Sequence, residues 1–536
     1  MKSKLFRNVA QGIIVAVALL LVGGVAQADT YMNMYGTSEE ANLWTGSSGL
    51  GMTLLTNLGC TSKKSYTTIT DSNNTKSTLV VGGGCTGTDG GFIFLTYTNK
   101  ASWDGIDAIN GVFDTANWGT YNSTYTTLTP TANPCGAGNG DQRPVATAAS
   151  CPGDATSCTG IAFSCQHIQV GVSNLEEAAI IQTTQGRLKG PMGGAYTCRG
   201  SQSQCNQTTA TAAWPPYAGS SATAQQMLAY PFAIYVNPGV TSYRCSSASG
   251  TTYYNNFCID DSNCGGTGGN HTLCIAQTID NLSRQQIVAL LSGQISNWDQ
   301  FGVYYPSKPV TVCMRHAGAG TLSVLDLGVM QGSTDGKGWG WDMTTSENPV
   351  TSAAGPPYFY FNDLQSDETN CLAWADGKTF SGQDSLPSSV KSGAIGYVDA
   401  DNADVSTSCA NSPLNPGSWT NVGCYQRIKY NGWLPTRITM HDGIYDSFWT
   451  VDRMYYNTSG ANALSPQQTT IMNQMISLAG NPTNLNSTTI PNQYLYYASP
   501  GELNFIRPGG NTFEYPLYQG CTNCASPDVV LKRKVK

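Results

Sequence analysis

The sequence predicts an α/β protein whose sheet contains parallel strands. Two short apolar stretches, residues 31–35 and 168–172, have the pattern of strands, and each leads through a polar turn into a helix-like segment, at 39–43 and 175–181. Residues 230–236 form a nearly continuous apolar run, which is typical of a strand buried on both faces of a sheet. Strands that alternate with helices in this way indicate α/β architecture.

The second half of the chain continues this alternation. Residues 281–291 carry leucine and isoleucine on one side of a predicted amphipathic helix, and Ser283 is its expected N-cap. Residues 309–315 and 393–398 are further predicted strands, and the apolar run 322–327 follows the first of them as a helix. These segments extend the same α/β pattern toward the C-terminus.

The stretch from Arg315 to Thr321 has the composition of an anion site. Arginine ends a predicted strand, small residues follow, and Thr321 precedes the helix. N–H groups at the start of a helix and the planar head group of arginine both favour negative charge. The residues also allow a structural alternative, in which Arg315 pairs with an acid across the molecule.

Long polar inserts separate the predicted elements, at residues 114–160, 185–225, 241–278 and 335–385. Unstructured loops of this length are uncommon in compact domains. The chain has 18 cysteines, and an even number in an exported chain indicates disulfides that hold such loops. Four of them lie within the insert 241–278, which predicts a self-contained disulfide knot: Cys245, Cys258, Cys264 and Cys274.

Residues 1–28 are the expected signal peptide. Basic residues begin it, an apolar run spans 13–22, and Ala26-Gln27-Ala28 suits signal cleavage. No later stretch is apolar for long enough to suggest a membrane span. The sequence therefore predicts a periplasmic or secreted protein.

The charge and the motifs exclude several classes of function. The formal net charge of the whole chain is −7, so nucleic acid is not an expected partner. Neither G-x-S-x-G nor H-E-x-x-H occurs, and no metal or cofactor set is indicated. The sequence therefore predicts a binding protein and not an enzyme.

The order of the motifs resembles the phosphate-binding periplasmic proteins of ABC transporters, within the type II periplasmic-binding-protein superfamily. The stretch with LSGQISNW, at 291–298, is the most specific of the matches, and the inserts have no counterpart in the resemblance. The matching stretches are YGTS at 35–38, VGVSN at 170–174, AIYVNPGV at 233–240, IDNLSRQQIVALLSGQISNWDQ at 279–300, RHAGAGT at 315–321, GAIGYV at 393–398 and IKYNGWLPTRITMHDGIYDSFWTV at 428–451.

The resemblance implies a two-lobed fold with disulfide-rich loop insertions and a ligand held between the lobes. Lobe one would comprise residues 29–232 and 399–536, and lobe two residues 233–398. The ligand would be an oxyanion, above all phosphate, passed to an ABC permease. The implied ligand contacts are Thr37, Ser38, Ser173, Asn174, Arg315, Gly318, Ala319, Gly320 and Thr321, with a further Gly/Ser turn near 82–91.

Two of these positions depart from the family pattern. Phosphate binders of the family have an aspartate where this chain has Asn174, and that carboxylate accepts the proton of hydrogen phosphate. Ala319 stands where a hydroxyl donor is usual. Asparagine carries no charge and can donate, so the basis of anion discrimination changes.

Local acidity is a further departure. Glu40 and Glu176 each follow a hydroxyl residue by three positions, which predicts capping boxes at two helix starts. In the alternative interpretation, the acids beside these turns disfavour free phosphate.

A second hypothesis is therefore a cell-surface or extracellular binding or scaffold protein that keeps the fold without phosphate transport. The disulfide-bearing inserts and the altered ligand turns favour it.

Overall fold

The computed structural model describes residues 29–506 and 517–518, apart from breaks at 72–74, 88–90, 113–118, 122–127, 131–132, 137, 178, 180–221, 316–318, 332–342, 344–347, 349–354, 363–364, 374–391, 403–424, 446, 461 and 486–494. The expected signal peptide and most of the inserts 185–225 and 335–385 lie outside the described residues.

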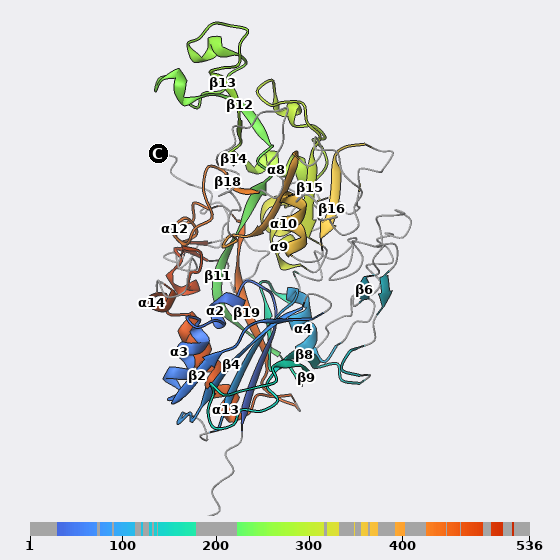
Figure 1. The fold of residues 1–536 in the computed structure, drawn as a ribbon, viewed down its shortest axis with the longest axis vertical. Helices are drawn as coiled ribbons and strands as arrows, with labels where there is room; N and C mark the ends of the chain where they lie inside the picture. Colours follow the sequence, from blue (N-terminus) through green and yellow to red (C-terminus); the bar gives the residue numbers. More distant parts are fainter. Residues whose placement is uncertain are drawn as a thin grey trace, which may run out of the picture.

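The fold is α/β, as predicted, and is built around one 13-stranded mixed sheet (Figure 1). The main path of the sheet runs β16-β15-β17-β11-β19-β10-β1-β5-β4-β2. Its strands are β1 (Thr30–Gly36), β2 (Ser62–Ser65), β4 (Lys76–Gly83), β5 (Ile93–Asn99), β10 (Val170–Ser173), β11 (Ala222–Val236), β15 (Thr311–Arg315), β16 (Tyr358–Asn362), β17 (Ala394–Asp399) and β19 (Trp449–Asn457). Off this path lie β3 (Ile69–Thr70), β14 (Asn281–Leu282) and β18 (Gln426–Tyr430).

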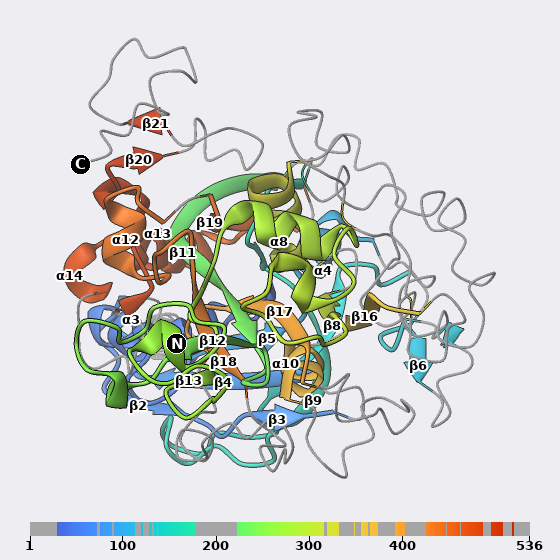
Figure 2. The same ribbon diagram turned by 90° about the horizontal axis from the view of Figure 1, so that it is seen from above.

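The molecule has two lobes, and strand β11 runs from one into the other (Figures 1 and 2). Its residues 222–231 pair with β19, in the part of the sheet that holds β1, β5 and β10 and that we call the lower lobe. Its residues 232–236 pair with β17, in the part that holds β15 and β16 and that we call the upper lobe. The apolar run at 230–236 therefore lies where the lobes meet, which explains why it is buried throughout.

The chain crosses between the lobes a second time near its C-terminal end. Strand β18 pairs with residues 234–236 of β11 and with β14 in the upper lobe, although it follows residue 399. The chain then returns through residues 431–448 to β19 in the lower lobe. Two separate connections thus join the lobes.

The helices lie on either side of the two parts of the sheet (Figure 1). They are α2 (Ala41–Trp44), α3 (Leu50–Asn57), α4 (Ser102–Asn110), α8 (Arg284–Leu291), α9 (Gly320–Leu325), α10 (Gln365–Ala373), α12 (Arg437–His441), α13 (Pro466–Ala479) and α14 (Pro482–Leu485). None of the described helices is both long and apolar enough to cross a membrane.

Helix α8 confirms the predicted N-cap and corrects the predicted start of the helix. The Ser283 hydroxyl accepts a hydrogen bond from the N–H of Gln286 at 3.3 Å, and the Gln286 side chain accepts one from the N–H of Ser283 at 2.9 Å. The helix therefore begins after Ser283. Residues 281–282, predicted as helix, are instead strand β14, because they pair with β18.

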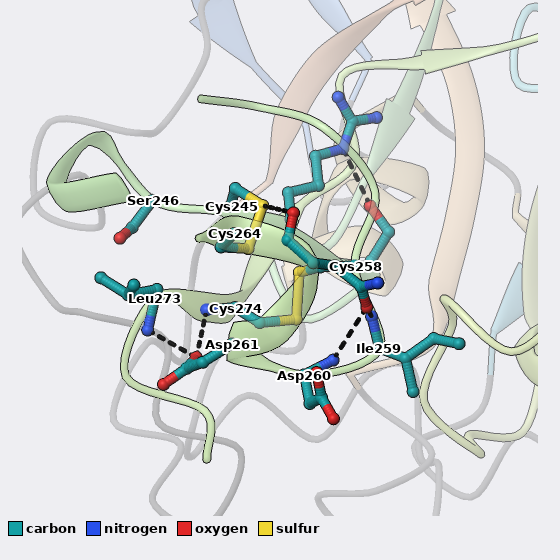
Figure 3. The surroundings of a disulfide bond; sticks show 12 residues. Cys245, Ser246, Cys258, Ile259, Asp260, Asp261, Cys264, Leu273 and Cys274 are labelled. Carbon is teal, nitrogen blue, oxygen red and sulfur yellow. Dashed lines mark hydrogen bonds between the residues drawn. A yellow bond between two sulfur atoms is a disulfide. The ribbon is translucent and has the colours of Figure 1, made fainter. Parts of the chain in front are cut away.

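The insert 241–278 forms the disulfide knot that the sequence predicts (Figure 3). Disulfides Cys245–Cys264 and Cys258–Cys274 both close within it, on the ribbon of β12 (Thr241–Cys245) and β13 (Cys274–Thr278). Figure 1 shows this ribbon at the tip of the upper lobe, far from the lower lobe. The other described disulfides are Cys60–Cys85, Cys135–Cys165, Cys151–Cys158 and Cys313–Cys371.

One buried carboxylate organises the inside of the knot. Both oxygens of Asp261 accept hydrogen bonds, from the N–H and hydroxyl of Thr272 and from the N–H groups of Leu273 and Cys274 (Figure 3). Burial by itself raises the pKa of Asp261, but these hydrogen bonds outweigh it and lower the pKa below its usual range. The carboxylate thus ties the start of β13 to the turn that begins at Asp261.

Helix α4 packs unusually close to the sheet of the lower lobe, at Gly105. A methyl group on Gly105 would lie 2.6 Å from the carbonyl oxygens of both Tyr35 and Val172. The glycine thus brings the helix onto the backbone of β1 and β10, whose carboxyl ends begin the turns described below.

We predict that Gly105→Ala destabilises the protein by about 1–3 kcal/mol, because the added methyl group forces α4 off the sheet. Alanine in place of a helical glycine normally stabilises a helix, so the sign of the effect is diagnostic. Urea unfolding of the mature protein measures it. Gly501→Ala is the matched control, since its nearest neighbour would be the Ser499 hydroxyl at 3.6 Å. An equal loss of unfolding free energy in the two variants would contradict the prediction.

Candidate functional site

The carboxyl ends of three parallel strands meet at one edge of the lower lobe. Strand β1 pairs in parallel with β5 and with β10, and Gly36 lies opposite both Asn99 and Val172. The turns that follow are tied together, because the N–H of Thr37 donates to Val172 at 3.1 Å and the N–H of Lys100 donates to Gly36 at 2.5 Å. Such an edge is where open α/β sheets bind ligands.

The expected contact near residues 82–91 is wrong for the described part of that turn. Strand β4 runs antiparallel to β5, and Gly82 lies opposite Ile93 at the beginning of β5. Ile93 in turn lies opposite Thr30, the first residue of β1. The end of β4 is therefore at the opposite edge of the sheet from the site.

Ser102 takes part in the site instead, and sequence reasoning missed it. It is the first residue of α4, directly after β5, and its hydroxyl donates to the side-chain oxygen of Asn174 at 2.5 Å. The available signal was the sequence TNKAS, in which a strand ends and a hydroxyl residue follows shortly after it, as Thr37 and Ser38 follow β1.

Asn174 is completely buried and is the centre of the lower-lobe turns. Its side-chain nitrogen donates to the Glu39 carboxylate at 3.0 Å, and its backbone carbonyl accepts from the Thr450 hydroxyl. With the bond from Ser102, it joins the turns after β1, β5 and β10 to strand β19. Members of the resembled family have a carboxylate at this position. Here the neutral amide instead binds the side chain of Glu39.

The hydroxyl residues beside Asn174 are partly committed to the chain itself. The Ser173 hydroxyl donates to the carbonyl of Leu175 at 2.8 Å. Thr37 is buried, and its carbonyl accepts from the Tyr97 hydroxyl at 2.7 Å, whereas Ser38 is partly exposed. Ser38 is thus the most accessible of the expected lower-lobe contacts.

The upper-lobe turn meets the lower lobe at Gly320. Strand β15 ends at Arg315, Ala319 precedes α9, and Gly320 and Thr321 begin it, all of them buried. Gly318 lies outside the described residues. A methyl group on Gly320 would fall 1.5 Å from the side-chain oxygen of Asn174, so the two turns are in direct contact across the lobes.

Arg315 lies among carboxyl groups of both lobes. Only 8% of it is exposed, and its backbone N–H donates to the Tyr397 hydroxyl at 3.1 Å. Its positive charge acts on Glu39 in the lower lobe and on Asp399 and Glu368 in the upper lobe, where it partly offsets the effect of burial on their pKa values. The charge of Arg315 therefore acts on buried acids of both lobes.

Five carboxyl groups gather where the lobes join, and we call them the carboxyl cluster: Glu39, Glu40, Asp399, Asp401 and Asp452. Asp399 ends β17, Asp452 belongs to β19, and Asp401 accepts a hydrogen bond from the Tyr230 hydroxyl at 2.7 Å. Burial raises the pKa of every member and brings that of Glu40 to about 8. Burial therefore opposes ionisation throughout the cluster.

Members of the cluster act on each other through their charges. Burial raises the pKa of Asp399 and of Asp452 well above its usual range, and the nearby charges of Glu39 and Glu40 raise these pKa values further. The site therefore disfavours ionisation of all these groups at once.

The predicted capping box at Glu40 is wrong. Glu40 is itself the residue before α2, it makes no capping bond, and its carboxylate accepts from the indole N–H of Trp44 at 3.2 Å. Burial beneath Trp44 and beside Asp452 has overridden the local pattern. Glu176, expected in a second capping box, instead forms an ion pair with Arg453 at 3.1 Å.

Comparison with known proteins gives structural neighbours only. No family model matches the chain, and no curated protein matches it. The phosphate-binding protein from Stenotrophomonas maltophilia is similar with 12% identity and a TM-score of 0.34, over 84% of each chain. A high affinity periplasmic phosphate-binding protein, PfluDING, is similar with 12% identity and a TM-score of 0.38, over 87% of this chain and 90% of that one. An ABC-type phosphate transport receptor from Vibrio cholerae shares 13% identity with a TM-score of 0.26, over 49% of this chain and 68% of that one.

At these identities and TM-scores, an activity has to be inferred from the residues of the site. Their arrangement offers an arginine, hydroxyl groups and helix N–H groups from two lobes, next to buried carboxyl groups.

We predict that Asn174→Asp makes stability depend strongly on pH. The new carboxylate would face that of Glu39 at 3.0 Å, so the folded state would need an extra proton and the folded-state pKa of the pair would rise. Stability is then kept at low pH and lost as pH increases, by about 1.4 kcal/mol for each pH unit and proton. Thermal unfolding at pH 5 and pH 8 should show that the variant loses more stability, relative to the wild type, at pH 8.

The double variant Asn174→Asp with Glu39→Gln is the control, because it restores an amide–carboxylate bond with the roles exchanged. Charge repulsion is not the cause if the single variant loses the same stability at both pH values. The same conclusion follows if the double variant recovers no stability at pH 8.

Proposed function

We propose that this chain is an exported solute-binding protein that captures a small oxyanion between its lobes for an ABC permease, and that the oxyanion is phosphate. The observation that carries the proposal is the contact between Asn174 and Gly320, which brings one turn from each lobe to the same point beside Arg315. Lobe one would be the lower lobe and lobe two the upper lobe, with β18 in lobe two although the resemblance assigns residues 399–536 to lobe one.

The donors for the anion would come from both lobes. Ser38, Thr37 and Ser173 would contribute from lobe one. Arg315 and Thr321, together with backbone N–H groups at 318–320, would contribute from lobe two. A ligand that touches both lobes stabilises the arrangement in which they are closed.

Glu39 supplies the carboxylate that position 174 lacks. Its side chain is held by the Asn174 amide at 3.0 Å and is 4% exposed. Hydrogen phosphate carries a proton that an ionised Glu39 could accept, whereas sulfate carries none and would meet only repulsion. The asparagine then orients the acceptor and does not abolish the discrimination.

Calorimetric titration of the mature protein with phosphate, arsenate and sulfate tests the proposal. We expect phosphate and arsenate to bind and sulfate to bind at least tenfold more weakly. The proposal is wrong if none of the three anions gives a heat of binding and none of them shifts the unfolding temperature.

We predict that Arg315→Met reduces phosphate affinity at least a hundredfold, because a charged donor is replaced by an apolar group of similar length. Arg244→Met is the matched control. Arg244 lies on the knot, where it pairs with Asp280 at 3.1 Å and stacks on Phe257 at 4.5 Å. Equal affinity in the two variants would place the anion elsewhere.

A further inference from the structure

The three parallel strands of the upper lobe all end in a polar residue. Strand β15 pairs in parallel with β16 and with β17, and their last residues are Arg315, Asn362 and Asp399. These ends lie toward the lower lobe, because Asp399 pairs with Phe232 where β11 crosses between the lobes, and the turn after β15 leads to Gly320. Asn362 therefore lies at the edge of the upper lobe that meets the candidate site.

Asn362 and Arg315 lie side by side on the same face of the sheet. They are register partners in the parallel pair of β15 and β16, and the side chains of such partners point the same way. Asn362 is completely buried, and 8% of Arg315 is exposed. Cys313, two residues before Arg315, forms a disulfide with Cys371, so this is the face that helix α10 covers.

The hydrogen bonds of Asn362 determine which of its side-chain atoms is the acceptor. Its nitrogen donates to the backbone carbonyls of Met314 at 2.9 Å and Tyr360 at 3.2 Å. Because a carbonyl can only accept, an amide turned the other way would lose both bonds. The remaining atom, the side-chain oxygen, is buried and has no hydrogen-bond partner among the described residues.

A second acceptor without a partner lies on the same face of the sheet. Glu368 of α10 is completely buried, and one of its carboxyl oxygens accepts from the N–H of Tyr397 at 3.0 Å. The other oxygen has no hydrogen-bond partner in the described part of the chain. Unpaired buried acceptors are unfavourable. Beside a buried arginine, they indicate a ligand that brings negative charge together with hydrogen-bond donors.

An unpaired oxygen by itself is not a binding site, as Asn33 shows. Its side chain is also buried, its nitrogen donates to the carbonyl of His167 at 2.9 Å, and its side-chain oxygen has no partner among the described residues. It lies within β1, opposite Thr96, and not at the end of the strand. The position of Asn362 beside Arg315 at a strand end is what distinguishes it.

We propose that Asn362 is a further ligand contact, whose side-chain oxygen accepts a hydrogen bond from a hydroxyl group of the anion held by Arg315. The inference rests on the proposed function and specifies its ligand class. Glu39 would accept a hydrogen bond from one hydroxyl group of the anion and Asn362 from another. The preferred ligand is then a singly charged oxyanion with two hydroxyl groups, of which dihydrogen phosphate is the simplest example.

Calorimetric titration of the mature protein at pH 5 with three related anions tests this inference. Dihydrogen phosphate, hydrogen phosphite and hypophosphite are all singly charged at that pH, and each carries one hydroxyl group fewer than the one before it. We expect the wild type to bind dihydrogen phosphate about tenfold or more tightly than hydrogen phosphite, because the analogue leaves a buried acceptor unpaired. Hypophosphite should bind more weakly still.

Asn362→Leu is the diagnostic variant, since an apolar group of similar size replaces the acceptor. We expect its preference for dihydrogen phosphate over hydrogen phosphite to fall to about threefold or less. Asn362→Asp keeps an acceptor oxygen and should keep the preference, which separates hydrogen bonding from packing. Asn33→Leu is the matched control and should leave the preference at the wild-type value. The readout is a ratio of affinities, so a variant that is partly unfolded still reports it.

The inference is overturned if Asn362→Leu binds phosphate with the same preference as the wild type, and the proposed function then still stands. A wild type that binds hydrogen phosphite as tightly as dihydrogen phosphate would have the same consequence. If no anion of the series binds, the inference and the proposed function are both wrong.

Discussion

The packing of the Asn174 side chain against the backbone of Gly320 is the contact on which the interlobe site depends. No side chain fits at position 320, because even a methyl group would overlap the Asn174 amide. Asn174 in turn is fixed by Ser102, Glu39 and Thr450, which come from three different segments of the chain. The lower lobe therefore presents a fixed Asn174 side chain, and the upper lobe contacts it with the backbone of Gly320.

Burial of carboxyl groups at this junction determines its chemistry. A cluster of ionised acids without water would be prohibitively unfavourable, so protons and a few cations must compensate. Burial raises the pKa values of Glu39, Glu40 and Asp399, and the charge of Arg315 partly offsets this effect at Glu39 and Asp399. The same arrangement can hold an oxyanion that brings its own proton, since such a ligand can donate to an acid as well as accept from the arginine.

Local sequence patterns predicted the elements whose partners are close in the chain. The Ser283–Gln286 cap and the two disulfides within 241–278 are examples, because each needs only residues within one short segment. Predictions failed where a distant partner decided the outcome. Residues 281–282 became a strand because β18 lies beside them, and Glu40 left its expected capping role for Trp44 and Asp452.

The sequence by itself determined the α/β class, the order of the strands along the chain, the knot, and the positions of Asn174 and Arg315 at strand ends. Periodicity, turn residues and cysteine spacing are local properties, so they can be recognised without coordinates. Only the tertiary structure decided that Ser102 bonds to Asn174, that β4 ends at the far edge, and that several buried acids gather around Arg315. Most of those relations join residues far apart in the chain, as in the Glu39–Asn174 bond across 135 positions, and sheet pairing and lobe packing bring them together.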